Sequence, residues 1–272
     1  MKNAIVTVMP DESVAQRALD RAMFDKEALL LVYQPIHDAR TREIYSAEAL
    51  LRQRRESGEV REAKIINEAA EEGPELFALT STLVRMAYTD AARWHAAGAP
   101  DVRLNLNLSP REFQEGNVGA RVKDLVTACG VNVTKLNFEI TETTYIEDPE
   151  ATMSVLEGLC ELGVHLWLDD FGTGHSSLTH IQHFPLEGIK LPGDFVRGIL
   201  DSKRCRAIVH RLIDLAHDLD MKVIAEEVEK QEQLDALLEY GIDYIQGFLF
   251  SKPMEIDDFI TFTKECAPQP AR

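Results

Sequence analysis

Short apolar stretches with alternating side chains recur along the chain, and longer amphipathic stretches separate them. Side chains alternate between two faces along a strand, whereas they repeat about every 3.6 residues along a helix. The alternating stretches predict strands at 29–36, 44–51, 102–108, 134–140, 164–169, 187–191, 222–226 and 242–246. The amphipathic stretches predict helices at 11–27, 63–72, 77–97, 117–129, 149–162, 204–219, 230–240 and 255–265.

The order of these elements favours a (β/α)8 barrel, because strand-then-helix units repeated over about 250 residues are typical of that fold. A doubly wound open sheet is the alternative, but the G-x-G-x-x-G fingerprint of many such sheets does not occur. Only the turn at 38–41 separates the first two strands, so these strands should form a hairpin. We therefore expect an α/β fold, a TIM-like barrel with one antiparallel strand at its start.

The predicted barrel takes up most of the chain. We expect a helical extension at 1–27, one barrel domain at 28–266 and a short tail at 267–272. No linker rich in Pro, Gly or Ser interrupts the middle range. A domain of this length can bury a large core without disulfides.

One face of the predicted strands is polar. The stretch 103–108 (RLNLNL) alternates leucine with asparagine, and 136–141 (LNFEIT) and 164–169 (VHLWLD) alternate similarly. The apolar face can pack under helices, so the polar face should point into the barrel, with its last residue at the C-terminal mouth where active sites of this fold lie. The residues expected at this mouth are Glu48, Asn107, Glu139, Asp169, Asp170, Lys190, Glu226 and Gln246.

The carboxylates and amides of this set suggest a metal site. Buried charges are costly unless they are paired or bound to metal. Oxygen ligands suit hard divalent cations such as Mg²⁺ or Mn²⁺, and the adjacent Asp169 and Asp170 could serve two ions. In the alternative reading, the carboxylates only accept hydrogen bonds from backbone amides, and Asn107 only caps a following helix.

Composition narrows the class of protein. The 272 residues include 29 basic and 46 acidic ones, a net charge of −17, which argues against binding to nucleic acid polymers or to anionic membranes. The four cysteines show no C-x-x-C pairing and indicate neither a zinc site nor a disulfide framework. No apolar run is long enough to cross a bilayer and no signal peptide is recognisable, so we expect a cytoplasmic protein.

Eight short motifs occur in order at corresponding places in successive βα units. They are YQP (33–35), EALLR (48–52), NLSP (107–110), EITE (139–142), DDFGTG (169–174), IK (189–190), AEEVE (225–229) and QGFLFSKP (246–253). Each alone is weak, but together they resemble the EAL family of cyclic di-GMP phosphodiesterases. The resemblance covers residues 28–254.

The resemblance implies metal-dependent hydrolysis of cyclic di-GMP to linear 5′-pGpG, which lowers this second messenger in bacterial signalling, including biofilm control. It implies two ions, Mg²⁺ or Mn²⁺, one held by Glu48, Asn107, Glu139 and Asp169 and the second by Asp169 and Asp170. Glu226 would act on the attacking water as a base or as a ligand of the second ion, and Lys190 would stabilise charge on the phosphate or hold the water.

Other residues take their roles from the same resemblance. Arg52 would pair with a substrate phosphate, unless it is a simple surface cation. Gln34, Leu50 and Gln246 match positions that line the substrate groove. Glu142 and Glu229 end two of the motifs and are expected to support the site. The segment 169–174 matches a loop that couples dimerisation to metal binding, so we expect a homodimer, with a separate regulatory protein as an open possibility.

Three departures from the family pattern bear on activity. The segment 53–58 (QRRESG) lacks the usual Trp, the usual Lys-x-Asp reads Lys190-Leu191-Pro192, and Glu227 stands where the family has Gly. We expect 53–58 to cover the mouth and the Glu227 side chain to point away from the metals. The alternative function is a degenerate EAL module that acts as a cyclic di-GMP receptor or as a protein-interaction module.

Overall fold

The computed structural model describes residues 29–55, 57–63, 76–100, 102–109, 111–112, 118–129, 132–141, 149–172 and 181–266. The helix predicted at 11–27, most of the one predicted at 63–72, the extension and the C-terminal tail lie outside these residues. The chain divides into two compact units, a smaller one of Met1–Leu30 and Leu51–Leu83 and a larger one of Leu31–Leu50 and Val84–Arg272.

Strands and helices alternate along the chain, as predicted. The strands are β1 (Leu29–Asp38), β2 (Ile44–Arg54), β3 (Val60–Glu62), β4 (Arg103–Leu108), β5 (Leu136–Thr141), β6 (His165–Asp169), β7 (Gly188–Leu191), β8 (Lys222–Ala225), β9 (Tyr244–Ile245) and β10 (Met254–Glu255). The helices are α3 (Leu76–Ala96), α5 (Val118–Cys129), α6 (Pro149–Glu161), α8 (Gly193–Gly198), α9 (Lys203–Asp218), α10 (Gln231–Glu239) and α11 (Ile256–Cys266), with a 3-10 turn at Val133–Lys135. None of the described helices is long and apolar enough to cross a membrane.

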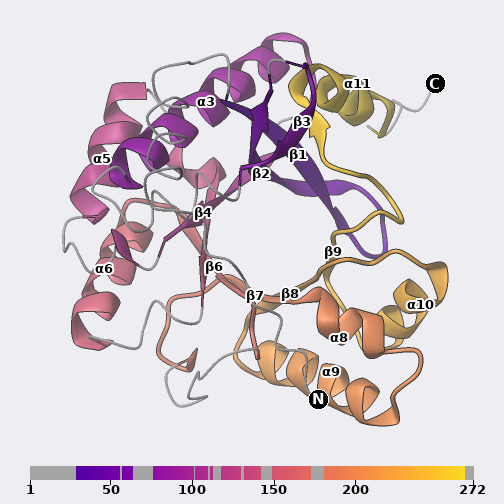
Figure 1. Cartoon of the computed structure of the whole chain (residues 1–272). Helices are drawn as coiled ribbons and strands as arrows, with labels where there is room; N and C mark the ends of the chain where they lie inside the picture. The colour runs from indigo at the N-terminus through magenta and orange to yellow at the C-terminus, as the bar shows by residue number, and fades with distance from the viewer. Residues whose placement is uncertain are drawn as a thin grey trace, which may run out of the picture. The chain divides into compact units, whose positions relative to one another are not determined.

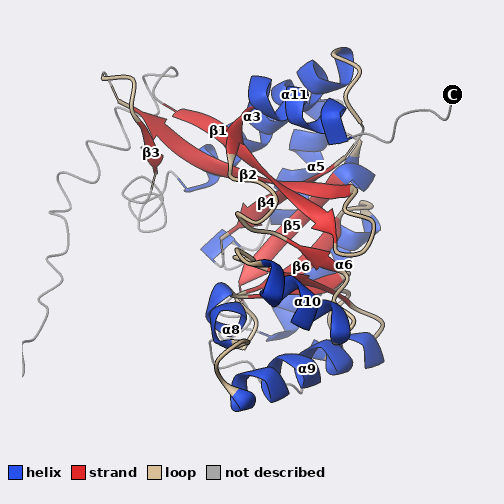
Figure 2. Ribbon diagram, turned by 90° about the vertical axis from the view of Figure 1, so that its right-hand side faces the viewer, coloured by secondary structure: helices blue, strands red, loops and turns tan. Residues whose placement is uncertain are grey.

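Eight strands close into a barrel in the order β1, β9, β8, β7, β6, β5, β4 and β2, and β2 pairs back with β1. Strands β4 to β9 lie wholly in the larger unit, as do β1 from Leu31 onward and β2 up to Leu50. Each pair of neighbouring strands from β2 through β4 to β9 runs parallel. The pair of β9 and β1 is antiparallel. The predicted barrel with one antiparallel strand at its start is therefore confirmed. Figure 1 shows its strands as a ring with α5, α6, α9, α10 and α11 outside it, and Figure 2 shows them from the side.

Four elements were not predicted: β3, β10, α8 and the 3-10 turn. Each is six residues or shorter, too short to carry a recognisable hydrophobic period. In the smaller unit β3 pairs antiparallel with the end of β2, so that Arg52 is opposite Glu62 and Gln53 is opposite Arg61. The Arg61 side chain donates to the Gln53 side chain over 3.1 Å.

Large apolar side chains fill one part of the barrel interior. Ile36, Trp167 and Ile224 are fully buried and form one cluster, against which Tyr45 and Tyr244 pack. Because Trp167 on β6 is separated from Ile224 by β7 and from Ile36 by three strands, their contact crosses the barrel interior. An eight-stranded barrel is just wide enough for side chains to fill it, and this cluster fills part of that interior.

Candidate active site

The strand ends at the barrel mouth bring the predicted charged residues together. Parallel register pairs Asn107 on β4 with Glu139 on β5, and Thr141 with Asp169 on β6. The next strand, β7, carries Lys190, and Glu226 follows directly after β8. Side chains two residues apart share a strand face, which is why alternation in the sequence was sufficient to predict this convergence.

The Lys190 ammonium lies among four carboxylates. Its Nζ is 2.8 Å from Glu139 Oε2, 2.7 Å from Glu226 Oε1, 3.4 Å from Asp169 Oδ1 and 3.6 Å from Glu48 Oε2. The side chain is only 1% exposed. Burial alone would lower the pKa of Lys190, but the surrounding carboxylates raise it well above its usual range, so this lysine stays charged.

Amide side chains orient Glu48. Asn107 Nδ2 donates to Glu48 Oε1 over 3.1 Å, and Gln246 Nε2 donates to Oε2 over 2.7 Å. Burial opposes ionisation of Glu48, but Lys190 and these two donors lower its pKa overall. The Glu48 side chain, which lies in the larger unit, is therefore ionised and held in one orientation.

A buried asparagine pair, missed by the sequence analysis as part of the site, supports Glu139. Asn105 Nδ2 donates to Glu139 Oε1 over 2.7 Å, and Asn137 Nδ2 donates to Asn105 Oδ1 over 2.9 Å. Both asparagines are fully buried. The signal was present, since Asn105 lies two residues before Asn107 and Asn137 two before Glu139, on the same strand faces.

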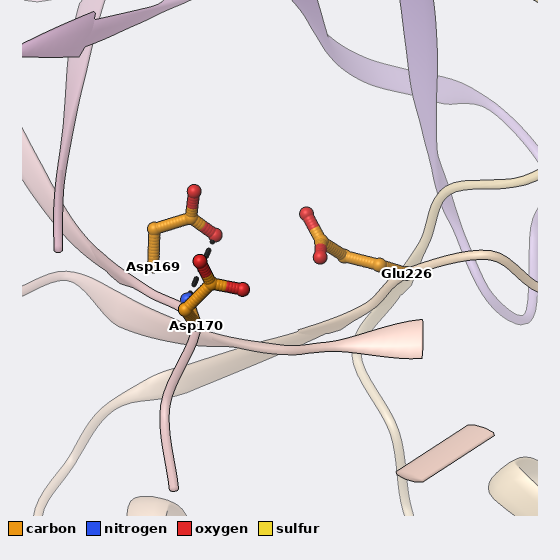
Figure 3. Close-up of side chains that lie close together, drawn as sticks. All are labelled: Asp169, Asp170 and Glu226. Carbon is orange, nitrogen blue, oxygen red and sulfur yellow. Dashed lines mark hydrogen bonds between the residues drawn. The ribbon is translucent and has the colours of Figure 1, made fainter. Parts of the chain in front are cut away.

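Asp169, Asp170 and Glu226 form a second group of oxygen atoms. One carboxylate oxygen from each lies within 4.8 Å of the others, and Figure 3 shows the three carboxylates facing one gap. Asp170 follows β6 in the left-handed region with a φ of 54°, and its backbone N–H donates to Asp169 Oδ1 over 3.0 Å. Aspartate tolerates this conformation better than most residues.

The donor set fits divalent cations. Four carboxylates surround a single lysine and a fifth, Asp170, lies beside Asp169 and Glu226, which leaves an excess of negative charge. Burial and the neighbouring carboxylates Glu48 and Asp169 raise the pKa of Glu139 well above its usual range, against the attraction of Lys190. Burial is also the main cause that raises the pKa of Glu226 to about 7. Cations held by these oxygens would relieve the repulsion.

The predicted substrate-binding residues lie in both units. In the larger unit Gln246 Nε2 also donates to Gln34 Oε1 over 3.3 Å, and Gln34 Nε2 donates to the Ser251 carbonyl over 3.4 Å, while Leu50 is half-buried. In the smaller unit Arg52 donates to the Leu51 carbonyl over 2.9 Å, so its contact with substrate stays a prediction.

Of the two residues expected to support the site, only Glu229 is among the described residues, and its role stays a prediction. Glu142 lies outside the described residues. Glu229 is exposed, and its backbone N–H donates to Gln233 Oε1 over 2.9 Å.

Comparison with known proteins identifies the family. The EAL domain family profile matches residues 16–253. The chain belongs to the EAL domain family. Among curated relatives of this EAL domain, the cyclic di-GMP phosphodiesterase PdeR of Escherichia coli K12 is 33% identical over 235 residues, which cover 86% of this chain and 35% of PdeR. Other curated relatives are also matched over less than half of their length, between 28% and 46%.

Solved structures agree with the EAL assignment. The PaMucR phosphodiesterase in complex with c-di-GMP superimposes with a TM-score of 0.84 at 27% identity, covering 90% of this chain and 99% of that chain. Klebsiella pneumoniae BlrP1, solved with manganese and cy-diGMP, superimposes with a TM-score of 0.72 at 27% identity, covering 84% of this chain and 56% of that chain.

Two of the three departures from the EAL pattern leave the mouth residues in place. Leu191 ends β7 in extended geometry, and Pro192 is the N-cap of α8 with a φ of −64°. The Glu227 side chain is about half exposed and pairs with Arg197 of α8, so the prediction that it points away from the metal residues agrees with this contact. The third departure, 53–58, belongs to the smaller unit, and its position over the mouth stays a prediction.

Proposed function

We propose that this EAL domain hydrolyses cyclic di-GMP to 5′-pGpG with two divalent cations, Mg²⁺ or Mn²⁺. The observation that supports this most is the convergence of Glu48, Glu139, Asp169 and Glu226 on Lys190 at the barrel mouth. A receptor that only binds nucleotide would not need five carboxylates there. The names of PdeR and of PaMucR, both phosphodiesterases, support the same substrate.

The site residues would hold the metal ions and bind the nucleotide. Glu48, Asn107, Glu139 and Asp169 would hold one ion, and Asp169 and Asp170 the second. When bound, the ions would supply Lewis acidity toward the phosphate and the attacking water. Gln34, Leu50, Arg52 and Gln246 would bind the nucleotide, Arg52 through a phosphate.

Two residues would act at the reacting atoms. The oxygen of the water forms a new bond to phosphorus while the bond from phosphorus to the 3′ oxygen breaks, and the leaving 3′ oxygen takes up a proton from solvent, so that the product carries a 5′-phosphate and a 3′-hydroxyl. Glu226 accepts a proton of the water as the general base. Lys190 stays protonated and stabilises the charge that develops on the phosphate oxygens.

The biological setting is part of the proposal. The protein would act in the bacterial cytoplasm as a homodimer, open to regulation by a separate protein, and would lower the level of the messenger. Light scattering at assay concentration tests the dimer, and a fully active monomer would reject it.

The dependence of hydrolysis on divalent cations tests the proposed enzymatic activity. Purified protein is treated with a chelator, dialysed, and incubated with cyclic di-GMP with and without added Mn²⁺, and products are separated by chromatography. We expect 5′-pGpG only after Mn²⁺ is restored. Product formation at the same rate in the chelator-treated protein would contradict the proposed use of cations.

A further inference from the structure

Glu227 lies at the junction of two departures from the EAL pattern. Strands β7 and β8 pair in parallel with Leu191 beside Ala225, and the Glu226 N–H donates to the Leu191 carbonyl over 3.0 Å. Glu227 and Pro192 are thus neighbours at the ends of adjacent strands. The acid that the family carries at 192 is missing, and a new acid stands at 227.

The backbone of Glu227 is in an unfavourable conformation. Its φ of 52° lies in the left-handed region, where the family's glycine has no steric cost but a glutamate does. Such a residue persists where its surroundings hold it. The side-chain contacts show what holds this one.

Glu227 Oε2 accepts from Nη1 of Arg197 on α8, and Nη2 of the same guanidinium donates to Asp194 Oδ1. The Glu227 side chain also lies directly over Gly193, since a methyl group at residue 193 would overlap its carboxylate. We call Glu227 and Arg197 the clamp. The clamp joins the turn after β8 to the helix that follows β7.

Resting on the proposed function, we propose that Glu227 is a positioning residue that holds Glu226 against Lys190. Lys190 lies three residues before α8, and Glu226 directly precedes Glu227. The clamp therefore connects the two strand ends whose side chains form the 2.7 Å Glu226–Lys190 ion pair. Loosening it would leave the charges present but let Glu226 move away from the attacking water, which lowers kcat more than it raises KM.

A double-mutant cycle tests this inference. Glu227→Gln, Arg197→Met and the double variant are assayed for kcat and KM with cyclic di-GMP under saturating Mn²⁺. Each single variant should lower kcat by about threefold to fivefold, the upper range for an exposed ion pair, with KM nearly unchanged. The double variant should lose no more than either single variant, because the two residues act as one unit.

A second variant displaces the clamp without removing a charge. Gly193→Ala should push the Glu227 carboxylate aside and lower kcat as Glu227→Gln does. The matched control is Arg211→Met, which breaks an exposed pair with Asp214 on α9 and should leave kcat unchanged. The inference is overturned if Gly193→Ala keeps full kcat, if the single losses add up in the double variant, or if kcat falls only in step with thermal stability.

Because Glu226 offers an oxygen to the same cluster as Asp169 and Asp170, the affinity for Mn²⁺ also depends on its position, and calorimetric titration with Mn²⁺ separates this inference from the proposed function. The wild type could hydrolyse no cyclic di-GMP while the variants of the cycle show the same non-additive loss in their affinity for Mn²⁺. In that case the proposed function fails and the clamp stands. If the wild type is active and neither kcat nor Mn²⁺ affinity responds to any clamp variant, the clamp fails alone.

Discussion

Lys190 and Glu226, at the ends of the adjacent strands β7 and β8, form a buried ion pair with 2.7 Å between Nζ and Oε1. The same ammonium is within 3.6 Å of Glu48, Glu139 and Asp169. One cation thus neutralises part of the negative charge of four carboxylates. In the proposed reaction this ammonium would stabilise negative charge on the phosphate, while the divalent ions would neutralise the charge of the carboxylates.

Removal of the Lys190 charge should destabilise the metal-free protein. Lys190→Met leaves four carboxylates without their shared cation, and breaking a buried pair in this way costs about 3 kcal/mol. Urea unfolding in the presence of a chelator measures the change. Lys222→Met is the control, because Lys222 is half exposed and its pair with Asp243 contributes at most about 1 kcal/mol. Equal losses in the two variants would contradict a special role for the buried lysine.

Glu48 should contribute to metal binding rather than to proton transfer. Glu48→Gln keeps the size of the side chain but removes its charge, and we expect weaker Mn²⁺ binding together with lower activity. Calorimetry with Mn²⁺ alone measures the affinity. An unchanged Mn²⁺ affinity would remove Glu48 from the proposed metal site.

The asparagine pair under Glu139 should matter although neither residue touches substrate. Asn105→Ala removes the donor to Glu139 Oε1 and the acceptor of Asn137 Nδ2, and each buried group left unsatisfied costs about 1–3 kcal/mol. We expect lower stability and weaker Mn²⁺ binding. Chemical unfolding and calorimetry on this variant check both, and wild-type values in both would contradict the supporting role.

The sequence predicted much of the fold and of the site because one rule governs both. Alternation in 103–108 and 136–141 identified the strands and also placed Asn107 and Glu139 at the mouth. Alternation could not show distances across the barrel, so it missed that Lys190 lies at the centre of the carboxylates. Alternation could not predict α8 either, since Gly193–Gly198 is too short to show a helical period. The contact between Glu227 and Arg197 of α8 was therefore not predicted.

His37 should make stability depend on pH. It is buried, and its Nδ1 must carry the proton because it donates to the Arg42 carbonyl over 3.0 Å, while Nε2 has no partner among the described residues. Burial lowers the pKa of His37 below its usual value. Above a pH of about 6.5 both folded and unfolded states are neutral, and below it only the unfolded state takes up the proton, so stability falls as the pH falls.

The matched variant is His37→Asn, whose Nδ2 can replace the Nδ1 donor but does not titrate. Urea unfolding between a pH of about 7.5 and about 5 should show a smaller loss of stability in this variant than in the wild type. Identical losses would show that His37 does not contribute.

The most direct test of the central claim compares turnover and binding in Glu226→Gln and the wild type. With Mn²⁺ and cyclic di-GMP, the wild type should release 5′-pGpG, and Glu226→Gln should be slower by about 10²–10⁴-fold because the group that accepts the proton is lost. Calorimetry should show nearly equal nucleotide affinity, since the phosphate and base contacts remain. A wild type that binds cyclic di-GMP but forms no 5′-pGpG would show that the chain is a receptor and not a phosphodiesterase, whereas equal turnover in the two proteins would remove Glu226 from the proton transfer.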